Sequence, residues 1–295
     1  MQSDSARSDP KAAMRPQPED VQNLSSGTTS LAHAFAMARH RLGEREACAL
    51  FRDLLSISRT KIAANPDQLL DDGDVAKLTS SIVRRCRGEP LAYVTGRRGF
   101  RTIELAVGPS VLIPRWETEE LVQMALEHIA SSSRVLDLGT GSGCIALAIR
   151  KETGADVTAS DVSAPGLEVC RCNAETLGLG IQLVQSCWYE SIDGIFDVIV
   201  SNPPYVESDD PHFQCGDLLH EPRLALDGGP DGLAGLRHVV AGAPAHLSEG
   251  GRLLVEHGCD QQTQVQLLFT AAGFADIATH HDLGGLPRVT QGALP

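Results

Sequence analysis

The alternation of apolar and polar positions divides the chain into a polar start and several patterned segments. Residues 1–30 are rich in Ser, Pro, Asp and Gln. Such a segment buries too little apolar surface to offset the entropy of ordering, so it predicts a disordered extension. From residue 31 to about 90, apolar residues recur at helical spacing, as Leu50, Phe51 and Leu54 do. The segment 31–90 is therefore predicted to be a small helical bundle.

A β-hairpin linker is expected over residues 91–113. Its apolar stretches LAYVTG, TIELAV and VLIP are short and are typical of strands. The remaining segment, 114–295, begins with a helical pattern from Glu117 to Ala130. These boundaries predict a helical domain and a larger domain joined by the hairpin.

The larger segment then alternates between strand and helix patterns. Apolar runs such as VLDLG, DVTASD, IQLVQS, FDVIVS, RLLVEHG and FADIATH predict strands, and helical patterns such as CIALAIRK and QQTQVQLLFTAAG lie between several of them. Strands separated by helices favour parallel pairing with helices on both faces. The fold class predicted is α/β, with a mostly parallel sheet.

Composition narrows the kinds of partner. The chain has 295 residues, with 25 Lys+Arg against 38 Asp+Glu and a formal net charge of −13. A field of that sign disfavours nonspecific binding to nucleic acid. No apolar run approaches the roughly 18 residues of a membrane span, and the start lacks a secretory pattern, so a cytoplasmic protein with reduced cysteines is expected. Isolated C-x-C and H-x-C pairs lack a second pair, so no metal site is expected.

A glycine-rich loop follows the first strand of the α/β segment. It consists of Gly139, Thr140, Gly141, Ser142 and Gly143, directly before a helix. Glycines allow a sharp turn and a close approach of backbone to ligand. The loop lacks the Gly-Lys-Ser/Thr ending of a P-loop, and its third glycine comes one residue early for a dinucleotide fingerprint. It therefore indicates a ligand that is not held by its phosphates.

An acidic residue, Asp161, ends the next strand. A carboxylate at that position can accept hydrogen bonds from the hydroxyls of a ribose. The alternative is a local role at the start of the following helix, together with Ser163. Because the glycine loop precedes it in the correct place, we favour ribose binding.

A second loop, Asn202, Pro203, Pro204 and Tyr205, follows the strand FDVIVS. The loops after parallel strands meet at one edge of a sheet, so this loop is expected beside the glycine loop. A stiff turn is the simpler interpretation, since two prolines fix φ. The functional interpretation is that the Asn202 side-chain oxygen and the Pro203 carbonyl accept both N–H bonds of one planar NH₂ group, while Tyr205 packs on its face.

These motifs resemble the class I S-adenosylmethionine-dependent methyltransferases, and most closely the protein-(glutamine-N5) methyltransferases of the HemK/PrmC type. The segments EPLAYVTG, LIPRWETEELV, VLDLGTGSG, FDVIVSNPPY, HEPRLAL, DGLAG and GGRLLVEHG occur in the family's order, over residues 31–292. The resemblance implies a Rossmann-like fold, S-adenosyl-L-methionine as cofactor, and methylation of the Gly-Gly-Gln glutamine of class 1 peptide chain release factors. It also implies substrate recognition by the helical domain.

The resemblance also implies roles for particular residues. Cofactor contacts fall on Gly139 to Gly143, Asp161, Trp188 and Asn202, and substrate contacts on Asn202 to Tyr205, with Asn202, Pro203 and Tyr205 as the catalytic set. Asp137 is expected to hold the methionine end of the cofactor or to cap a turn; Arg115, Glu117 and Glu119 are expected to shape the cleft or to form ion pairs. The chain departs from the family at Trp116, Cys187 and Ala293, where Pro, Asp and Arg are usual.

Two other functions remain open from the sequence. An adenine-N6 nucleic-acid methyltransferase shares the Asn-Pro-Pro-Tyr chemistry, although the net charge of −13 argues against it. A cofactor-binding protein without catalysis would be expected to have a damaged loop, and both loops are intact. One cofactor loop and one substrate loop in a chain are consistent with a monomer.

Overall fold

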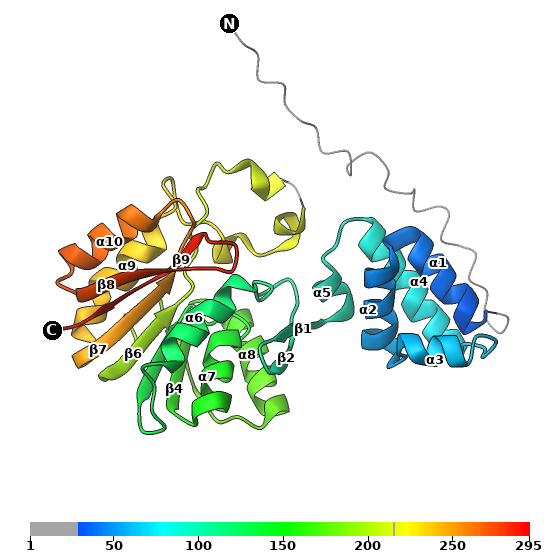
Figure 1. Ribbon diagram of the computed structural model, residues 1–295, viewed down its shortest axis with the longest axis horizontal. Helices are drawn as coiled ribbons and strands as arrows, with labels where there is room; N and C mark the ends of the chain where they lie inside the picture. Colours follow the sequence, from blue (N-terminus) through cyan, green and yellow to red (C-terminus); the bar gives the residue numbers. More distant parts are fainter. Residues whose placement is uncertain (1–28, 215) are drawn as a thin grey trace, which may run out of the picture. The chain divides into compact units, whose positions relative to one another are not determined.

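The computed structural model describes residues 29–214 and 216–295. These residues form two compact units, of which the first ends at Thr95 and the second runs from Gly96 to Pro295 (Figure 1). The boundary divides the predicted linker 91–113, and its hairpin belongs to the second unit. Every helix in the described ranges is too short or too polar to span a bilayer.

The first unit is the helical bundle that the pattern predicted. Its helices are α1 (Leu31–Leu42), α2 (Glu44–Leu55), α3 (Arg59–Ala64), α4 (Asp72–Cys86) and α5 (Leu91–Thr95). Leu31, Leu50, Phe51, Leu78 and Ile82 are fully buried between them. The helical period of the sequence is thus explained by one shared apolar core.

The predicted extension of residues 1–30 ends too late by two residues. Residues 1–28 lie outside the described part of the chain. Thr29 is buried, and its carbonyl accepts a hydrogen bond from the Leu70 amide at 3.0 Å. Ser30 caps α1, because its hydroxyl accepts from the His33 amide at 3.3 Å. Both residues therefore belong to the bundle.

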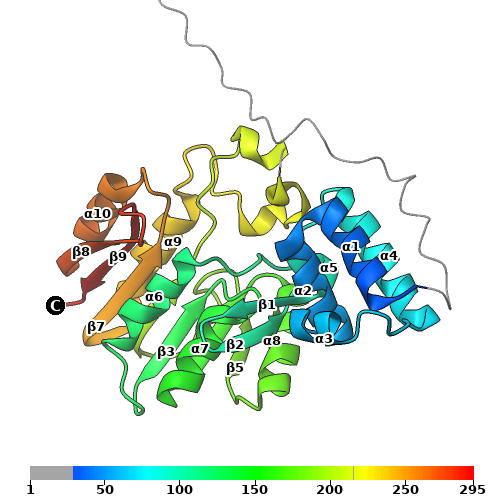
Figure 2. The same cartoon turned by 45° about the vertical axis from the view of Figure 1, so that its right-hand side comes forward.

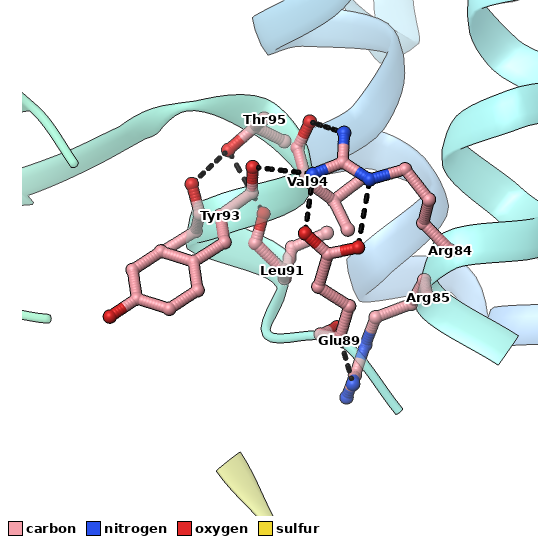
Figure 3. Close-up of polar contacts among 8 residues, drawn as sticks. Arg84, Arg85, Glu89, Leu91, Tyr93, Val94 and Thr95 are labelled. Carbon is pink, nitrogen blue, oxygen red and sulfur yellow. Dashed lines mark hydrogen bonds and ion pairs between the residues drawn. The ribbon is translucent and has the colours of Figure 1, made fainter. Parts of the chain in front are cut away.

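The prediction of a strand at LAYVTG was wrong, because this segment forms α5. The Pro90 carbonyl accepts from the amides of Tyr93 and Val94, both at 3.0 Å, which begins a helical turn. Arg84 on α4 stabilises this turn. Its guanidinium forms an ion pair with Glu89 and donates to the Tyr93 carbonyl at 3.1 Å (Figure 3). Contacts from a neighbouring helix override a weak strand pattern.

The hairpin consists of β1 (Arg97–Phe100) and β2 (Ile103–Ala106), which pair antiparallel. The sequence predicted the second strand and missed the first. VLIP, at 111–114, was wrongly predicted as a strand. Its Ile113 amide donates to the Glu221 carboxylate at 3.0 Å rather than to another strand, so the segment remains irregular.

The second unit contains a seven-stranded sheet within its described residues. The strands are β3 (Arg134–Leu138), β4 (Asp156–Asp161), β5 (Gln182–Gln185), β6 (Phe196–Ser201), β7 (Leu247–Glu256), β8 (Ala275–His281) and β9 (Pro287–Ala293). Their order is β5-β4-β3-β6-β7-β9-β8. The first five pair parallel, and β9 is antiparallel to both of its neighbours. The predicted mostly parallel sheet is confirmed; β9 was not predicted.

Helices cover both faces of this sheet (Figure 2). Val135 of β3 packs with α6 (Glu117–Leu126), α7 (Cys144–Thr153) and α8 (Ala164–Leu177). Leu136, its neighbour, packs on the other face with α9 (Ala234–Gly242) and α10 (Gln262–Ala271). Short 3₁₀ helices lie at Pro211–Gln214, Asp217–His220, Arg223–Ala225 and Ala243–Ala245. Burial of both faces explains the continuous apolar strand runs.

The chain order reverses around β3. From β3 it proceeds outward through β4 to β5, and then returns to place β6 on the other side of β3. Ligands of open α/β sheets bind outside the carboxyl ends of the strands at such a reversal. The loops after β3, β4 and β6 are therefore the part of the fold to examine for a site.

Candidate active site

A cavity of about 430 Å³ lies at this carboxyl edge, wholly within the second unit. Its lining comes from the loops after β3, β4, β5 and β6, together with Thr118 of α6 and segments near 110–114 and 222–238. Most of the predicted site residues line it: Gly139, Thr140, Gly141, Ser142, Asp161, Trp188, Asn202 and Pro204. Gly143, Pro203 and Tyr205 are adjacent in sequence to lining residues but do not themselves line the cavity. The structure thus brings together two loops that are about 60 residues apart in sequence.

The glycines of the first loop have two different structural roles. Gly139 and Gly141 have φ of 75° and 53°, in the left-handed region that favours glycine. Gly143 also has positive φ, and a Cβ there would lie 2.5 Å from the Cys170 sulfur and 2.9 Å from Leu147 Cδ1. Gly139 and Gly141 shape the cavity wall, whereas Gly143 allows close packing behind it.

Asp161 connects the glycine loop to the start of α8. Its Oδ2 accepts from the Gly141 amide and its Oδ1 from the Ser163 amide, both at 2.8 Å. Ser163 itself is the N-cap, since its hydroxyl accepts from Gly166. Each carboxylate oxygen keeps a further lone pair. Burial raises the pKa of Asp161, although the backbone donors oppose that shift.

Asp137 is completely buried beneath the same loop. Its Oδ2 accepts from the Thr140 hydroxyl at 2.7 Å and from the Ala146 amide at 3.1 Å, so it does cap the turn. Its Oδ1 has no hydrogen-bond partner among the described residues. Burial raises the pKa of Asp137 to about 7. A cationic donor would satisfy this oxygen and favour the ionised form, which fits the ammonium group of an amino-acid moiety.

Trp188 lines the cavity and has an unusual backbone conformation. Its φ of 50° is in the left-handed region, and its carbonyl accepts from the Ser186 hydroxyl at 2.8 Å. The indole is stacked on His238 of α9, with ring centroids 6.2 Å apart and an interplanar angle of 12°. Strain of this kind is often retained at functional sites. The sequence did not indicate His238 as a site residue, because a lone histidine in a helical pattern carries no signal. Cys187 also lines the cavity, and it is exposed.

Asn202 has a defined amide orientation. Its Nδ2 donates to the Thr118 hydroxyl of α6 at 3.1 Å, which leaves Oδ1 as the remaining acceptor of the amide. The Tyr205 hydroxyl donates to Glu256 Oε1 at 3.1 Å, and its ring packs with the apolar cluster under α9 and α10. Pro203 is buried. The sequence had indicated this loop, but not Thr118 or Glu256, although an acid within the apolar run RLLVE was a visible signal.

The Asn202–Tyr205 loop is held from behind by a glycine-rich turn. Val206, directly after the loop, pairs with this turn in both directions. Its amide donates to the Leu226 carbonyl at 3.0 Å, and its carbonyl accepts from the Gly228 amide at 2.8 Å. A Cβ on Gly228 would lie 2.8 Å from both the Pro204 carbonyl oxygen and the Tyr205 Cα. This approach is possible only without a side chain.

The substitution Gly228→Ala is therefore expected to displace the loop. We expect the activity of this site to fall about 10- to 100-fold, because a shift of about 1 Å in a positioning loop can cost that much. Affinity for the ligand of the glycine loop, measured by calorimetry, should change little. The matched control is Gly180→Ala, where nothing lies within 4 Å of the added Cβ and φ is ordinary. Equal activity of the two variants would contradict the role given to Gly228.

An ion pair fixes the far wall of the cavity. Arg115 pairs with Glu221, whose side chain is fully buried, and Glu221 Oε2 also accepts from Ile113. Of the alternatives for Arg115, the structure thus shows the ion pair. Glu119 accepts from the Arg101 amide at 3.1 Å, while Trp116 is 65% exposed and lies under the Arg98 guanidinium. The Arg115–Glu221 ion pair holds the segment before α6 against the segment that precedes the 3₁₀ helix Arg223–Ala225.

Comparison with known proteins decides the family. The PrmC N-terminal domain family matches residues 29–96, and the methyltransferase small domain family matches residues 118–229. A release factor glutamine methyltransferase of Xylella fastidiosa is 45% identical over 265 residues, which cover 88% of this chain and 96% of that protein. The chain belongs to the release factor glutamine methyltransferase family. A member from Burkholderia pseudomallei is 44% identical over 85% of this chain and 92% of its own length.

Membership of this family agrees with the fold. A methyltransferase from Pyrococcus furiosus superimposes with a TM-score of 0.51 at 19% identity, covering 64% of this chain and 87% of that one. The class I, Rossmann-like methyltransferase fold that the resemblance implied is confirmed. The match to the PrmC N-terminal domain, residues 29–96, covers the described part of the first unit, and the match to the methyltransferase small domain, residues 118–229, lies within the second.

Proposed function

We propose that this protein transfers a methyl group from S-adenosyl-L-methionine to the side-chain amide nitrogen of the glutamine in the Gly-Gly-Gln motif of class 1 release factors. Its relatives' name, release factor glutamine methyltransferase, supports the substrate. The observation that carries the proposal is the geometry of the cavity, which is bordered by both the glycine loop and Asn202. Such a cavity can bring a methyl donor and an amide together.

The residues present fit the cofactor. When bound, S-adenosyl-L-methionine supplies an electrophilic methyl group on a sulfonium sulfur. Asp161 would accept the ribose hydroxyls through its remaining lone pairs. Asp137, which is fully buried beneath the glycine loop and does not line the cavity, would attract the ammonium through its charge. Trp188 would pack against the adenine, and Gly139 and Gly141 would allow the backbone to approach. Cys187 stands where the family usually has Asp, so its thiol provides at most a weak contact there.

The substrate amide needs orientation rather than a strong base. Its nitrogen is a poor nucleophile because the lone pair is delocalised into the carbonyl. Asn202 Oδ1 and the Pro203 carbonyl accept its two N–H bonds and direct the nitrogen toward the methyl group. These acceptors gain strength as positive charge develops on nitrogen. As the nitrogen–methyl bond forms, the bond between the methyl group and the sulfonium sulfur would break, and S-adenosyl-L-homocysteine would leave as a neutral thioether. The methylated, charged amide is acidic and would release one N–H proton to water.

The experiment is mass spectrometry of the Gly-Gly-Gln segment after intact release factor is incubated with the enzyme and S-adenosyl-L-methionine. We expect one added methyl group, located on the glutamine. A parallel reaction with adenine-containing RNA tests the other chemistry that an Asn-Pro-Pro-Tyr loop serves. Methylated adenine with an unmodified glutamine would refute the proposal.

A further inference from the structure

A buried side-chain amide, that of Gln261, joins three segments at the carboxyl edge of the sheet. Gln261 is 7% exposed and directly precedes α10. Its Nε2 donates to the carbonyl oxygens of Tyr205 at 3.1 Å and of Gly232 at 3.2 Å. Its Oε1 accepts from the Gly258 amide at 2.8 Å. One amide therefore connects the Asn202–Tyr205 loop, the glycine-rich turn and the turn after β7.

These hydrogen bonds fix the orientation of the Gln261 amide. Nε2 is the only side-chain atom of glutamine that can donate, and its two partners are carbonyl oxygens, which can only accept. An amide turned by 180° would place an acceptor against acceptors and a donor against the Gly258 amide. The backbone is fixed as well, because the Gln261 amide donates to the Gly258 carbonyl and the Gln261 carbonyl accepts from Val265, both at 3.0 Å. The side chain is thus held in place before it meets the loop.

A glycine at position 232 leaves room for this contact. Gly232 belongs to the glycine-rich turn, since its carbonyl oxygen lies 2.7 Å from the position of a Cβ on Gly228. Its own φ is 68°, and a Cβ there would lie 2.6 Å from both Gln261 Nε2 and the Tyr205 carbonyl oxygen. The amide can therefore reach the loop only because this position carries no side chain.

The Asn202–Tyr205 loop is stiff between two fixed ends. Before its start, the hydroxyl of Ser201 at the end of β6 is buried and donates to the Leu138 carbonyl at 2.7 Å. At its end, the Tyr205 carbonyl accepts from Gln261. The two prolines between these ends have a restricted φ. A displacement of the Tyr205 carbonyl is therefore passed along the loop to the two acceptors that face the substrate amide.

We propose that Gln261 is a positioning residue that holds the end of this loop, so that the Asn202 Oδ1 and Pro203 carbonyl acceptors remain aimed at the substrate amide. This inference rests on the proposed function, because it concerns the same amide-binding loop. Gln261 does not line the cavity, so it acts through the loop rather than by contact with cofactor or substrate. Loss of alignment lowers kcat more than it lowers affinity for S-adenosyl-L-methionine.

Gln261→Glu separates this role from local support of the turn before α10. The variant keeps the length of the side chain and an oxygen that accepts from Gly258, but it has no NH₂ group to donate. We expect kcat for intact release factor to fall at least about tenfold. The KM for release factor and the dissociation constant of S-adenosyl-L-methionine should change less than about threefold. Initial rates by mass spectrometry and calorimetry measure these quantities.

Two glycine substitutions provide a matched pair. Gly232 and Gly250 have φ of 68° and 74°, so alanine is strained alike at both, but nothing lies within 4 Å of a Cβ on Gly250. Gly232→Ala should lower kcat as Gln261→Glu does, whereas Gly250→Ala should retain most of it at a similar loss of thermal stability. The kcat losses of Gln261→Glu and Gly232→Ala should not add in the double variant, because both break the same contact.

Retention of the wild-type kcat in Gln261→Glu would overturn the inference, since that variant preserves only the bond to Gly258. If Gln261→Glu does not fold, equal kcat values of Gly232→Ala and Gly250→Ala would overturn it as well. Wild-type enzyme that leaves the release factor unmodified refutes the proposed function instead, before any variant is compared.

Discussion

Asn202→Ala is expected to reduce methylation of the release factor glutamine by about 100- to 1,000-fold in kcat, which is the usual cost of removing one preorganised polar contact to a developing charge. The variant loses the Oδ1 acceptor that Thr118 orients at 3.1 Å, while the glycine loop and Asp161 remain intact. The measurement is a time course of methylation by mass spectrometry at saturating cofactor.

Cofactor binding distinguishes this role from a general loss of structure. Asn202 lines the cavity, but we expect the dissociation constant of S-adenosyl-L-methionine to rise only a few-fold. Thermal unfolding should be close to wild type, because Asn202 is only partly buried. Full activity of Asn202→Ala would exclude the amide-orienting role, and a loss confined to cofactor affinity would reassign the residue to the cofactor.

Asp161→Ala should raise the dissociation constant of S-adenosyl-L-methionine by more than tenfold, which corresponds to about 1.4 kcal/mol. The variant removes the acceptors for the ribose hydroxyls. It also removes the bonds to the amides of Gly141 and Ser163, so the loop loses support as well. Calorimetric titration with S-adenosyl-L-methionine measures the sum of both effects.

A thermodynamic cycle of two proteins and two ligands separates the loss of ribose binding from the loss of loop support. S-adenosylhomocysteine and its 2′-deoxy analogue differ by one ribose hydroxyl, so wild type should prefer the former and Asp161→Ala should bind both about equally. Asp156→Ala is the matched control, since Asp156 is exposed and lies at the other end of β4. An unchanged preference for the hydroxyl in Asp161→Ala would show that Asp161 serves only to connect the loop to α8.

Much of the fold could be predicted because its core is periodic. The strand runs of β3 and β6 and the second half of β7 are apolar on both faces, and the bundle helices repeat at helical spacing, so both patterns are visible locally. The glycine loop and the Asn202–Tyr205 loop were equally visible, because each follows such a strand. Their proximity followed from the rule that parallel strands share a carboxyl edge.

The errors occurred where long-range contacts determine local structure. LAYVTG is a helix because Arg84 and Pro90 provide partners for its backbone, and VLIP is irregular because Glu221 accepts the Ile113 amide. The strand β9 was missed because its residues are mixed in polarity and contain Gly292, which lies against Phe269. Apart from Pro90, which directly precedes LAYVTG, none of these partners is adjacent in sequence.

The sequence by itself determined the fold class, the family and the two loops that border the cavity, since these depend on local periodicity and on contiguous motifs. Only the tertiary structure decided which side chains stand behind those loops. Thr118, Glu256 and Gly228 are distant in sequence from the Asn202–Tyr205 loop, and the packing of α6, β7 and the glycine-rich turn brings them to it. The physical reason is that contacts between segments far apart in the chain form only when the sheet and its helices pack, so no local pattern specifies them.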